Sequence, residues 1–168
     1  MTLCPDCGYE NIDGADECEM CHQPLSALSK RAPASEVERS IVHDRVSRLE
    51  VRDPLLVRPD MPVGEVLRRM VEGRRGCAIV VEGTKLVGIF TERDALVKLN
   101  VDAARLAPRP VSEFMTRSVE TLELDDRIAF ALHKMDVGGY RHIPILSEGQ
   151  VTGVISVRHI LDYLTAAL

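Results

Sequence analysis

Hydrophobic and polar positions follow the same order in two long stretches of the chain. Residues 53–100 and 118–165 match each other at a constant offset of 65 positions without a gap, so that Gly88 corresponds to Gly153 and Arg93 to Arg158. An internal match at a fixed offset indicates a repeated structural unit. Because the unit occurs twice, the pattern predicts a closed pair of similar halves rather than an open solenoid.

In each half, the pattern of apolar and polar residues predicts the order strand, helix, strand, strand, helix. Apolar residues with helical spacing predict the first helix of a half, and a continuous apolar run before a Glu-Gly turn predicts a hairpin. The first half is expected to contain strand 55–57, helix 62–72, strands 77–81 and 85–90, and helix 92–99. A connector at 101–110 and a helical turn at 111–115 lead to strand 119–122, helix 126–137, strands 142–146 and 151–156, and helix 158–164.

A further helix is predicted before the repeats. Ser35 and Glu38 have the spacing of a capping box, and helical periodicity then places five apolar residues on one face, namely Val37, Ile41, Val42, Val46 and Leu49. This face either packs on the repeats or joins two chains, and we favour packing. The expected domains are residues 1–25, 26–52 (linker and helix), 53–110 and 111–168.

Residues 1–25 contain four cysteines with the spacing C-x2-C-x10-C-x2-C, namely Cys4, Cys7, Cys18 and Cys21. Each C-x2-C pair can form a tight turn that directs two sulfurs at one point, and four thiolates complete a structural zinc site. So short a segment has no adequate core, so metal binding would supply its folding free energy. The segment resembles a short zinc ribbon. A rubredoxin-like iron site and a disulfide pair remain open.

Charge disfavours a nucleic-acid partner. The chain of 168 residues is 45% hydrophobic and 28% charged, with a net charge of −5. Residues 1–25 include acidic side chains but no Lys or Arg, so this lobe should repel phosphate backbones. No apolar run reaches the ~18–20 residues of a membrane span, and the N-terminus does not resemble a secretory signal. We therefore expect a cytoplasmic protein.

The stretch GIFTERD carries the clearest candidate binding chemistry. It ends a predicted strand and begins a helix, where backbone N–H groups and the helix dipole favour a phosphate. Thr91 adds a hydroxyl, and Asp94 lies one turn further on the same face, where its carboxylate could accept hydrogen bonds from ribose hydroxyls. Alternatively, Thr91 is only a helix cap and Asp94 an acid favoured by the dipole.

The motifs LVGIFTERD, GVISVRH and GYRHIPIL, in this order of elements, resemble a tandem pair of CBS domains, or Bateman module, over residues 53–165. The resemblance implies an α/β (α+β) fold of two pseudo-symmetric β-α-β-β-α repeats packed together, after the Cys4 zinc ribbon. It also implies that Arg141 and His142 of the second repeat face Thr91 and Asp94 of the first.

One composite nucleotide site per chain is then expected. The base would lie in an apolar slot near Met115 and Val119. The second repeat has His159 where the first has Asp94, so the other site should be altered or empty. Cys77 is expected in the core.

The function implied is regulatory rather than enzymatic. We find no nucleophile–base pair, Walker loop or GxSxG motif in the sequence. The resemblance implies a sensor of an adenine nucleotide (AMP, ADP or ATP) or of S-adenosylmethionine, with a homodimer formed through the repeats. The ribbon would be a structural or docking lobe for a regulated protein. A CBS scaffold that has lost its ligand remains an alternative.

Overall fold

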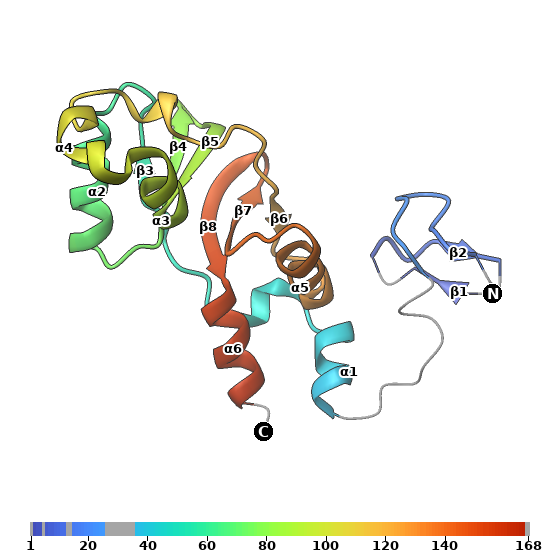
Figure 1. The fold of residues 1–168 in the computed structure, drawn as a ribbon. Coiled ribbons are helices and arrows are strands. Elements are labelled where there is room, and N and C mark those ends of the chain that lie inside the picture. The colour runs from blue at the N-terminus through green and yellow to red at the C-terminus, as the bar shows by residue number, and fades with distance from the viewer. Residues whose placement is uncertain (1, 5, 13–14, 26–35, 167–168) are drawn as a thin grey trace.

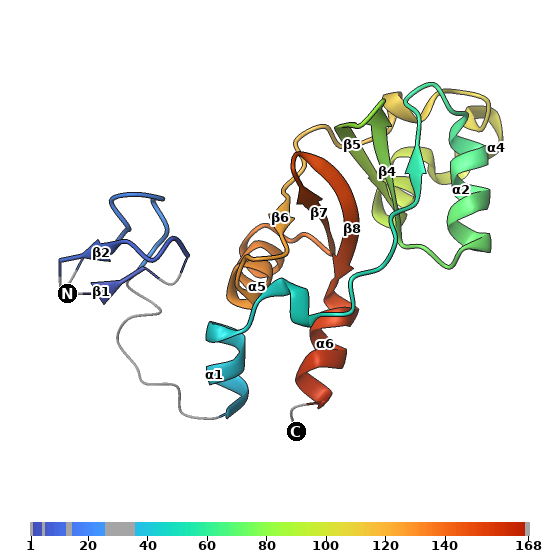
Figure 2. The ribbon, with the colours of Figure 1, turned by 180° about the vertical axis from the view of Figure 1, so that it is seen from behind.

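The fold consists of a small N-terminal lobe followed by two similar α/β halves (Figures 1 and 2). The computed structural model describes residues 2–4, 6–12, 15–25 and 36–166, with side chains in the first helix from residue 39 onward. In the N-terminal lobe, β1 (Thr2–Leu3) pairs antiparallel with β2 (Glu10–Asn11). No helix in these ranges is long and apolar enough to cross a membrane.

Each half contains a three-stranded sheet of the same topology. The sheets have the orders β3-β4-β5 and β6-β7-β8, in which the first pair is parallel and the second antiparallel. Both hairpins carry a bulge at the same repeat position, after Val80 and after Ile145. The strands are β3 (Leu56–Val57), β4 (Cys77–Glu82), β5 (Lys85–Thr91), β6 (Leu122–Glu123), β7 (His142–Ser147) and β8 (Gln150–Ser156).

Helices complete each half in the order that the sequence predicts. They are α2 (Val63–Glu72), α3 (Glu92–Asp94) continued by a π-helical turn η2 (Ala95–Leu99), α5 (Ile128–Val137) and α6 (Val157–Ala166). The apolar faces of α2 and α5 pack on the sheets and give each half its own core. Phe90 and Val66 are fully buried in the first core, and Ile128 and Ile143 in the second. The predicted fold class is confirmed.

The two sheets are joined by an exchange of connecting segments. Arg52 precedes the first sheet but forms a bridge with Val154 of β8, with N···O distances of 3.2 and 2.9 Å. Thr116 precedes the second sheet but forms a bridge with Ile89 of β5, at 2.8 and 2.9 Å. Between the sheets lies a small apolar cluster that includes Cys77, which confirms its predicted place in the core. Burial raises the pKa of its thiol to about 12.

The segment before the repeats packs on the second half. Helix α1 (Glu36–His43) contacts α5, and the 3-10 turn η1 (Val46–Arg48) follows it. Val46 donates its amide to the carbonyl of Asp126 at 2.7 Å. The described face of this segment thus packs on the second half, as favoured from the sequence. The proposed cap at Ser35 and Glu38 lies outside the described residues and side chains.

Three sequence-predicted elements differ from the structure. Helix α1 ends at His43, because Val46 and Leu49 enter the second core from η1 instead of extending the helix. The connector 101–110 contains η3 (Asn100–Asp102) and α4 (Ala103–Leu106), whose Leu106 is buried. The two prolines of this connector follow the helix, and so they end it rather than prevent it. Strand β6 begins at Leu122, three residues later than predicted, and the predicted turn at 111–115 is η4 (Val111–Glu113).

Candidate functional site

The four N-terminal cysteines converge on one point. Their sulfurs all lie within 4.8 Å of one another, with 3.5 Å between those of Cys4 and Cys21 and 3.6 Å between those of Cys7 and Cys18. Sulfurs bound tetrahedrally at about 2.3 Å from an ion lie about 3.8 Å apart, so this spacing fits a single metal ion. The residues after the two pairs, Gly8 and His22, both have positive φ, at 72° and 57°.

Burial raises the pKa values of Cys4 and Cys21, whereas the surroundings of Cys18 favour its ionised form. Burial opposes ionisation of Cys18, but the amides of Cys21 and Met20 and the side chain of Asn11 donate to its sulfur and lower its pKa to about 6. Asn11 is buried and also accepts from the amide of Glu19 at 3.0 Å. Sequence reasoning missed Asn11, whose only signal is a polar residue between the two cysteine pairs.

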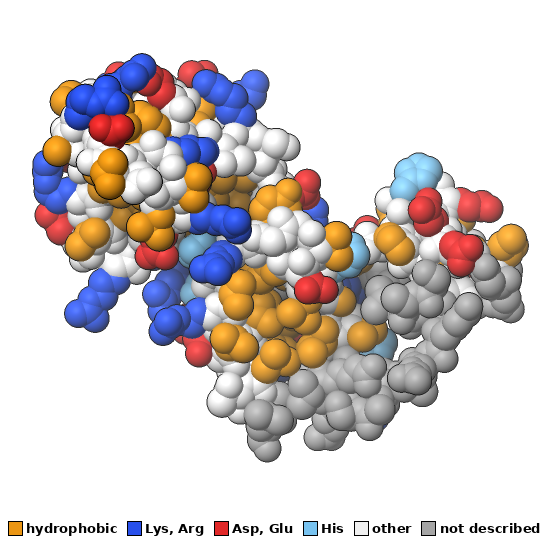
Figure 3. All heavy atoms as spheres, viewed as in Figure 1, with side chains coloured by type: hydrophobic (Ala, Val, Ile, Leu, Met, Phe, Trp, Pro, Cys, Tyr) orange, Lys and Arg blue, Asp and Glu red, His pale blue; other side chains and the backbone are white. Residues whose placement is uncertain are grey.

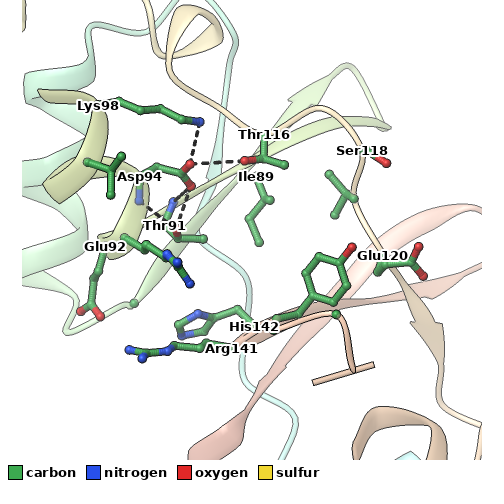
Figure 4. Close-up of a pocket in the computed structure, with 17 residues that line it drawn as sticks. Ile89, Thr91, Glu92, Asp94, Lys98, Thr116, Ser118, Glu120, Arg141 and His142 are labelled. Carbon is green, nitrogen blue, oxygen red and sulfur yellow. Dashed lines mark hydrogen bonds and ion pairs between the residues drawn. The ribbon is translucent and has the colours of Figure 1, made fainter. Parts of the chain in front are cut away.

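A cavity of about 320 Å³ lies between the two halves and contains most of the predicted nucleotide site (Figure 4). Thr91 and Asp94 line it from the first half, and Arg141 and His142 line it from the second. The repeat-to-repeat pairing that the resemblance implied is therefore present in the fold.

Thr91 and Asp94 form a reciprocal capping box at the junction of β5 and α3. The Thr91 amide and hydroxyl donate to Asp94 Oδ2 at 2.9 and 2.7 Å, and the Asp94 amide donates to Thr91 Oγ1 at 3.2 Å. The capping alternative is thus realised, and it holds the Asp94 carboxylate in place at the cavity wall. Because Oδ2 already accepts two hydrogen bonds within the box, a ribose hydroxyl would have to be bound by the other oxygen, Oδ1.

Lys98 and Thr116 complete the surroundings of Asp94, and sequence reasoning missed both. The Lys98 ammonium lies 2.6 Å from Asp94 Oδ1, and the Thr116 hydroxyl donates to the same oxygen at 3.3 Å. Burial raises the pKa of the Asp94 carboxyl, but Lys98 and Thr91 outweigh burial, so the pKa lies below its ordinary value. The i, i+4 spacing of Asp94 and Lys98 could have signalled this pair.

Across the cavity, Arg141 and His142 stand where β7 begins (Figure 4). Arg141 is exposed and forms no ion pair with a described carboxylate. His142 is half-buried, and its Nδ1 is a buried atom without a hydrogen-bond partner among the described residues. Burial lowers the pKa of His142, and Arg141 and His159 add to this effect while Glu92 opposes it.

The apolar wall of the cavity differs in part from the prediction. Val119 lines it as expected, together with Ile89, Val97 and Tyr140. Met115 is instead buried in the core of the first half, where it lies over Gly88. The reason is that the connector exchange turns Met115 toward β5 and leaves Thr116 and Val119 to face the cavity.

The corresponding region of the other half is a separate, smaller cavity of about 60 Å³. His159 replaces the carboxylate there, and its Nδ1 accepts from the Ser156 amide at 3.1 Å. Burial lowers the pKa of His159 and Arg52 adds to this effect, which Glu50 and Asp162 oppose.

Comparison with known proteins decides the family. The model of the CBS domain matches residues 46–100 and 111–166, which together are most of the chain. The chain belongs to the CBS-domain family. The tandem CBS pair thus accounts for both repeats, and the cysteine cluster precedes it.

Relatives by sequence come from several organisms. A 17.7 kDa protein of Acidianus ambivalens is 33% identical over 116 residues, which are 68% of this chain and 69% of that protein. CBS proteins of Arabidopsis thaliana also match, but the chain spans only about a fifth of their length.

Solved structures agree with the fold of the CBS pair. A protein with CBS domains from Burkholderia ambifaria superimposes with a TM-score of 0.66 and 26% identity, over 72% of this chain and 91% of that one. A CBS domain protein from Pyrobaculum aerophilum, complexed with AMP, gives a TM-score of 0.61 and 26% identity, over 73% and 99%.

Proposed function

We propose that the protein is a non-catalytic, cytoplasmic regulatory module that binds one adenine nucleotide per chain in the cavity between its CBS repeats. The observation that carries this proposal is the composition of the cavity. One wall presents the Asp94 carboxylate and Thr91, the opposite wall presents Arg141 and His142, and apolar side chains lie between. A ribose, a phosphate and a planar base need these three kinds of surface.

The complex of the Pyrobaculum aerophilum relative with AMP supports this ligand class. S-adenosylmethionine remains a second ligand to test. It carries the same adenosine group but a cationic sulfonium in place of phosphate, so it would gain less from Arg141. We therefore favour a phosphorylated adenosine.

Regulation follows from the position of the cavity. Its walls belong to different halves, so a bound nucleotide adds contacts that hold the halves at one angle. A ligand shifts a conformational equilibrium only by its difference in affinity for the two states. Contacts to both halves provide such a difference, since they are complete in one relative arrangement only.

The N-terminal lobe acts in this proposal as a structural zinc ribbon that docks a regulated protein. Four thiolates close the coordination shell, which favours a structural metal over a catalytic one. Iron remains the alternative, and it would colour the protein red. The predicted homodimer also stays a prediction. Exposed apolar side chains such as Val71 and Leu96 on the first half, and those over α5 and α6 in Figure 3, offer it surface.

Isothermal titration calorimetry with AMP, ADP, ATP and S-adenosylmethionine tests the nucleotide site. We expect about one nucleotide per chain, and a roughly tenfold or larger loss of affinity in Arg141→Gln and in Asp94→Asn, because each removes a charge-assisted contact. Arg158→Gln is the matched control, since Arg158 is exposed and lies outside the cavity.

Two results would contradict the proposal. Unchanged affinity in both cavity variants would show that the nucleotide binds elsewhere. No binding of any of the four ligands would instead favour the ligand-free scaffold, for which the exchange of a carboxylate for His159 in the second half is the supporting observation.

A further inference from the structure

The small second cavity cannot hold a nucleoside. Its volume is about 60 Å³, against about 320 Å³ for the main cavity. Pockets for small organic ligands span about 300–1,000 Å³. In addition, the side chain that would receive a ribose is the buried His159, whose Nδ1 is already engaged by the Ser156 amide.

Its lining is instead suited to an anion. Arg52, Arg74 and Arg75 line the cavity together with one carboxylate, that of Asp53, and none of the three arginines forms an ion pair in the part of the chain that is described. Other arginines, such as Arg58 and Arg109, do form such pairs. Guanidinium groups match phosphate oxygens with two parallel hydrogen bonds, so unpaired arginines around a small cavity favour a phosphate group.

The backbone holds two of these arginines in place. Arg52 is fixed by its two hydrogen bonds to Val154 of β8. Arg74 stands in the turn after α2 with a φ of 49°, and its amide donates to the carbonyl of Val71 at 3.1 Å. These contacts fix the backbone of both residues beside the cavity, while the side chains of Arg52 and Arg74 are exposed.

The two cavities adjoin each other at Gly76 and His142, which line both. The His142 ring packs directly on Gly76, where an added Cβ would lie 2.5 Å from Nε2. Arg141 and His142 are the groups that receive the first phosphate in the proposed function. A phosphate held by Arg141 and His142 would therefore lie beside the arginine-lined cavity, with the contact between His142 and Gly76 as the boundary between the two cavities.

We propose that the second cavity binds the terminal phosphates of the same nucleotide whose nucleoside occupies the main cavity. This inference rests on the proposed function and narrows its ligand to nucleoside di- and triphosphates. The two cavities together then form one elongated site, with the nucleoside at the Asp94 end and the polyphosphate at the Arg75 end. A monophosphate would leave the arginines without a partner.

Calorimetry at constant ionic strength tests the inference with AMP, ADP, ATP and inorganic pyrophosphate. We expect ATP to bind at least roughly tenfold more tightly than AMP, because it adds charge-assisted contacts. Arg75→Gln and Arg52→Gln, tested separately, should reduce that preference by roughly tenfold and leave AMP affinity within about twofold. Arg68→Gln removes the same charge from α2 outside the cavity and should change neither affinity.

The outcomes separate this inference from the proposed function. Equal affinity for AMP and ATP, or an equal loss of both in the arginine variants, overturns the inference and leaves the nucleotide site intact. Pyrophosphate binding that depends on Arg75 without any preference for ATP over AMP also overturns it, since the second cavity is then an independent anion site. If AMP and ATP both fail to bind, the proposed function itself fails.

Discussion

His159 keeps the helix-capping role that Asp94 has in the first repeat, but it lacks the carboxylate. In the first repeat, Asp94 Oδ2 accepts from the Thr91 amide at 2.9 Å, and in the second, His159 Nδ1 accepts from the Ser156 amide at 3.1 Å. Both side chains cap the final helix of their repeat. Only Asp94 brings a negative charge to its cavity, because a histidine side chain is either neutral or positively charged, and the lowered pKa of the buried His159 favours the neutral ring.

The protein should therefore lose stability as the pH falls below about 6.5, the ordinary histidine pKa. The pKa values of His142 and His159 are lowered in the folded state, so below that pH the unfolded state binds more protons and gains free energy relative to the folded one. Above it, both states bind the same number of protons at these groups. Urea unfolding at several pH values measures this dependence.

The variant His159→Asn isolates one of the two groups. Asparagine keeps an oxygen that can accept from the Ser156 amide but does not titrate, so the loss of stability toward low pH should be smaller than in the wild type. His142→Asn provides the matched comparison. An identical pH dependence in the wild type and in both variants would show that other groups dominate.

At this scale the sequence predicted the residues with a motif and missed those without one. Thr91 and Asp94 were predicted because they stand in one short stretch with a recognisable chemistry. Tyr140 and Thr116 were missed because only the packing of the two halves brings them to the same cavity. Met115 was misplaced because a connector's side chains cannot be assigned to a face without the partner strand.

Among the elements, the exchanged connectors depend on glycines in β5 and β8, the last strands of the two sheets. Gly153 of β8 faces Val51, and an added Cβ would lie 2.1 Å from Val51 Cγ1. Gly88 of β5 holds the corresponding place in the first half, and there the Cβ would lie 2.4 Å from Met115 Sδ. The absence of a side chain lets each connector approach the strand of the other half.

Gly153→Ala should destabilise the protein by about 1–3 kcal/mol, because the stiff, β-branched Val51 cannot move aside within a packed region. Gly88→Ala is the matched variant and should cost less, since Met115 is flexible. Thermal or urea unfolding measures both. In the double variant Val51→Ala/Gly153→Ala the clash is gone, so the two changes should cost less together than the sum of their separate costs.

The order of the elements was predictable, whereas their ends were not. The fixed offset and the apolar periodicity determine the β-α-β-β-α order in each half. The end of α1 depends on tertiary packing, because Val46 and Leu49 reach the second core only if the chain leaves the helix at His43. The short helix α4 was missed since its prolines indicated a loop.

For the whole molecule, the metal site and the CBS pair should behave as separate cooperative units. The described N-terminal core contains little besides Leu25 and the cysteines, so a chelator should unfold residues 1–25. Each CBS half has its own apolar core and should be unaffected. Circular dichroism and amide hydrogen exchange, before and after chelation, measure the two parts.

Cys18→Ser offers a test of the metal site without a chelator. It should release the metal and leave nucleotide affinity unchanged, while Cys77→Ser, outside the cluster, should retain the metal. Metal content by atomic absorption checks both variants. Loss of nucleotide affinity on metal removal would contradict the separation of the two units.

The packing of the segment 44–52 on the second half also affects the order in which the chain can fold during synthesis. Val46 leaves the ribosome long before Ile128, to whose core it belongs, and the entire first repeat is made between them. The first repeat can fold as soon as its own residues have emerged from the ribosome. The second repeat can fold only after the last helix has emerged, and it must then pack against the segment 44–52, which emerged much earlier. A protease cut near residue 53 would consequently loosen the distant C-terminal half rather than the adjacent one.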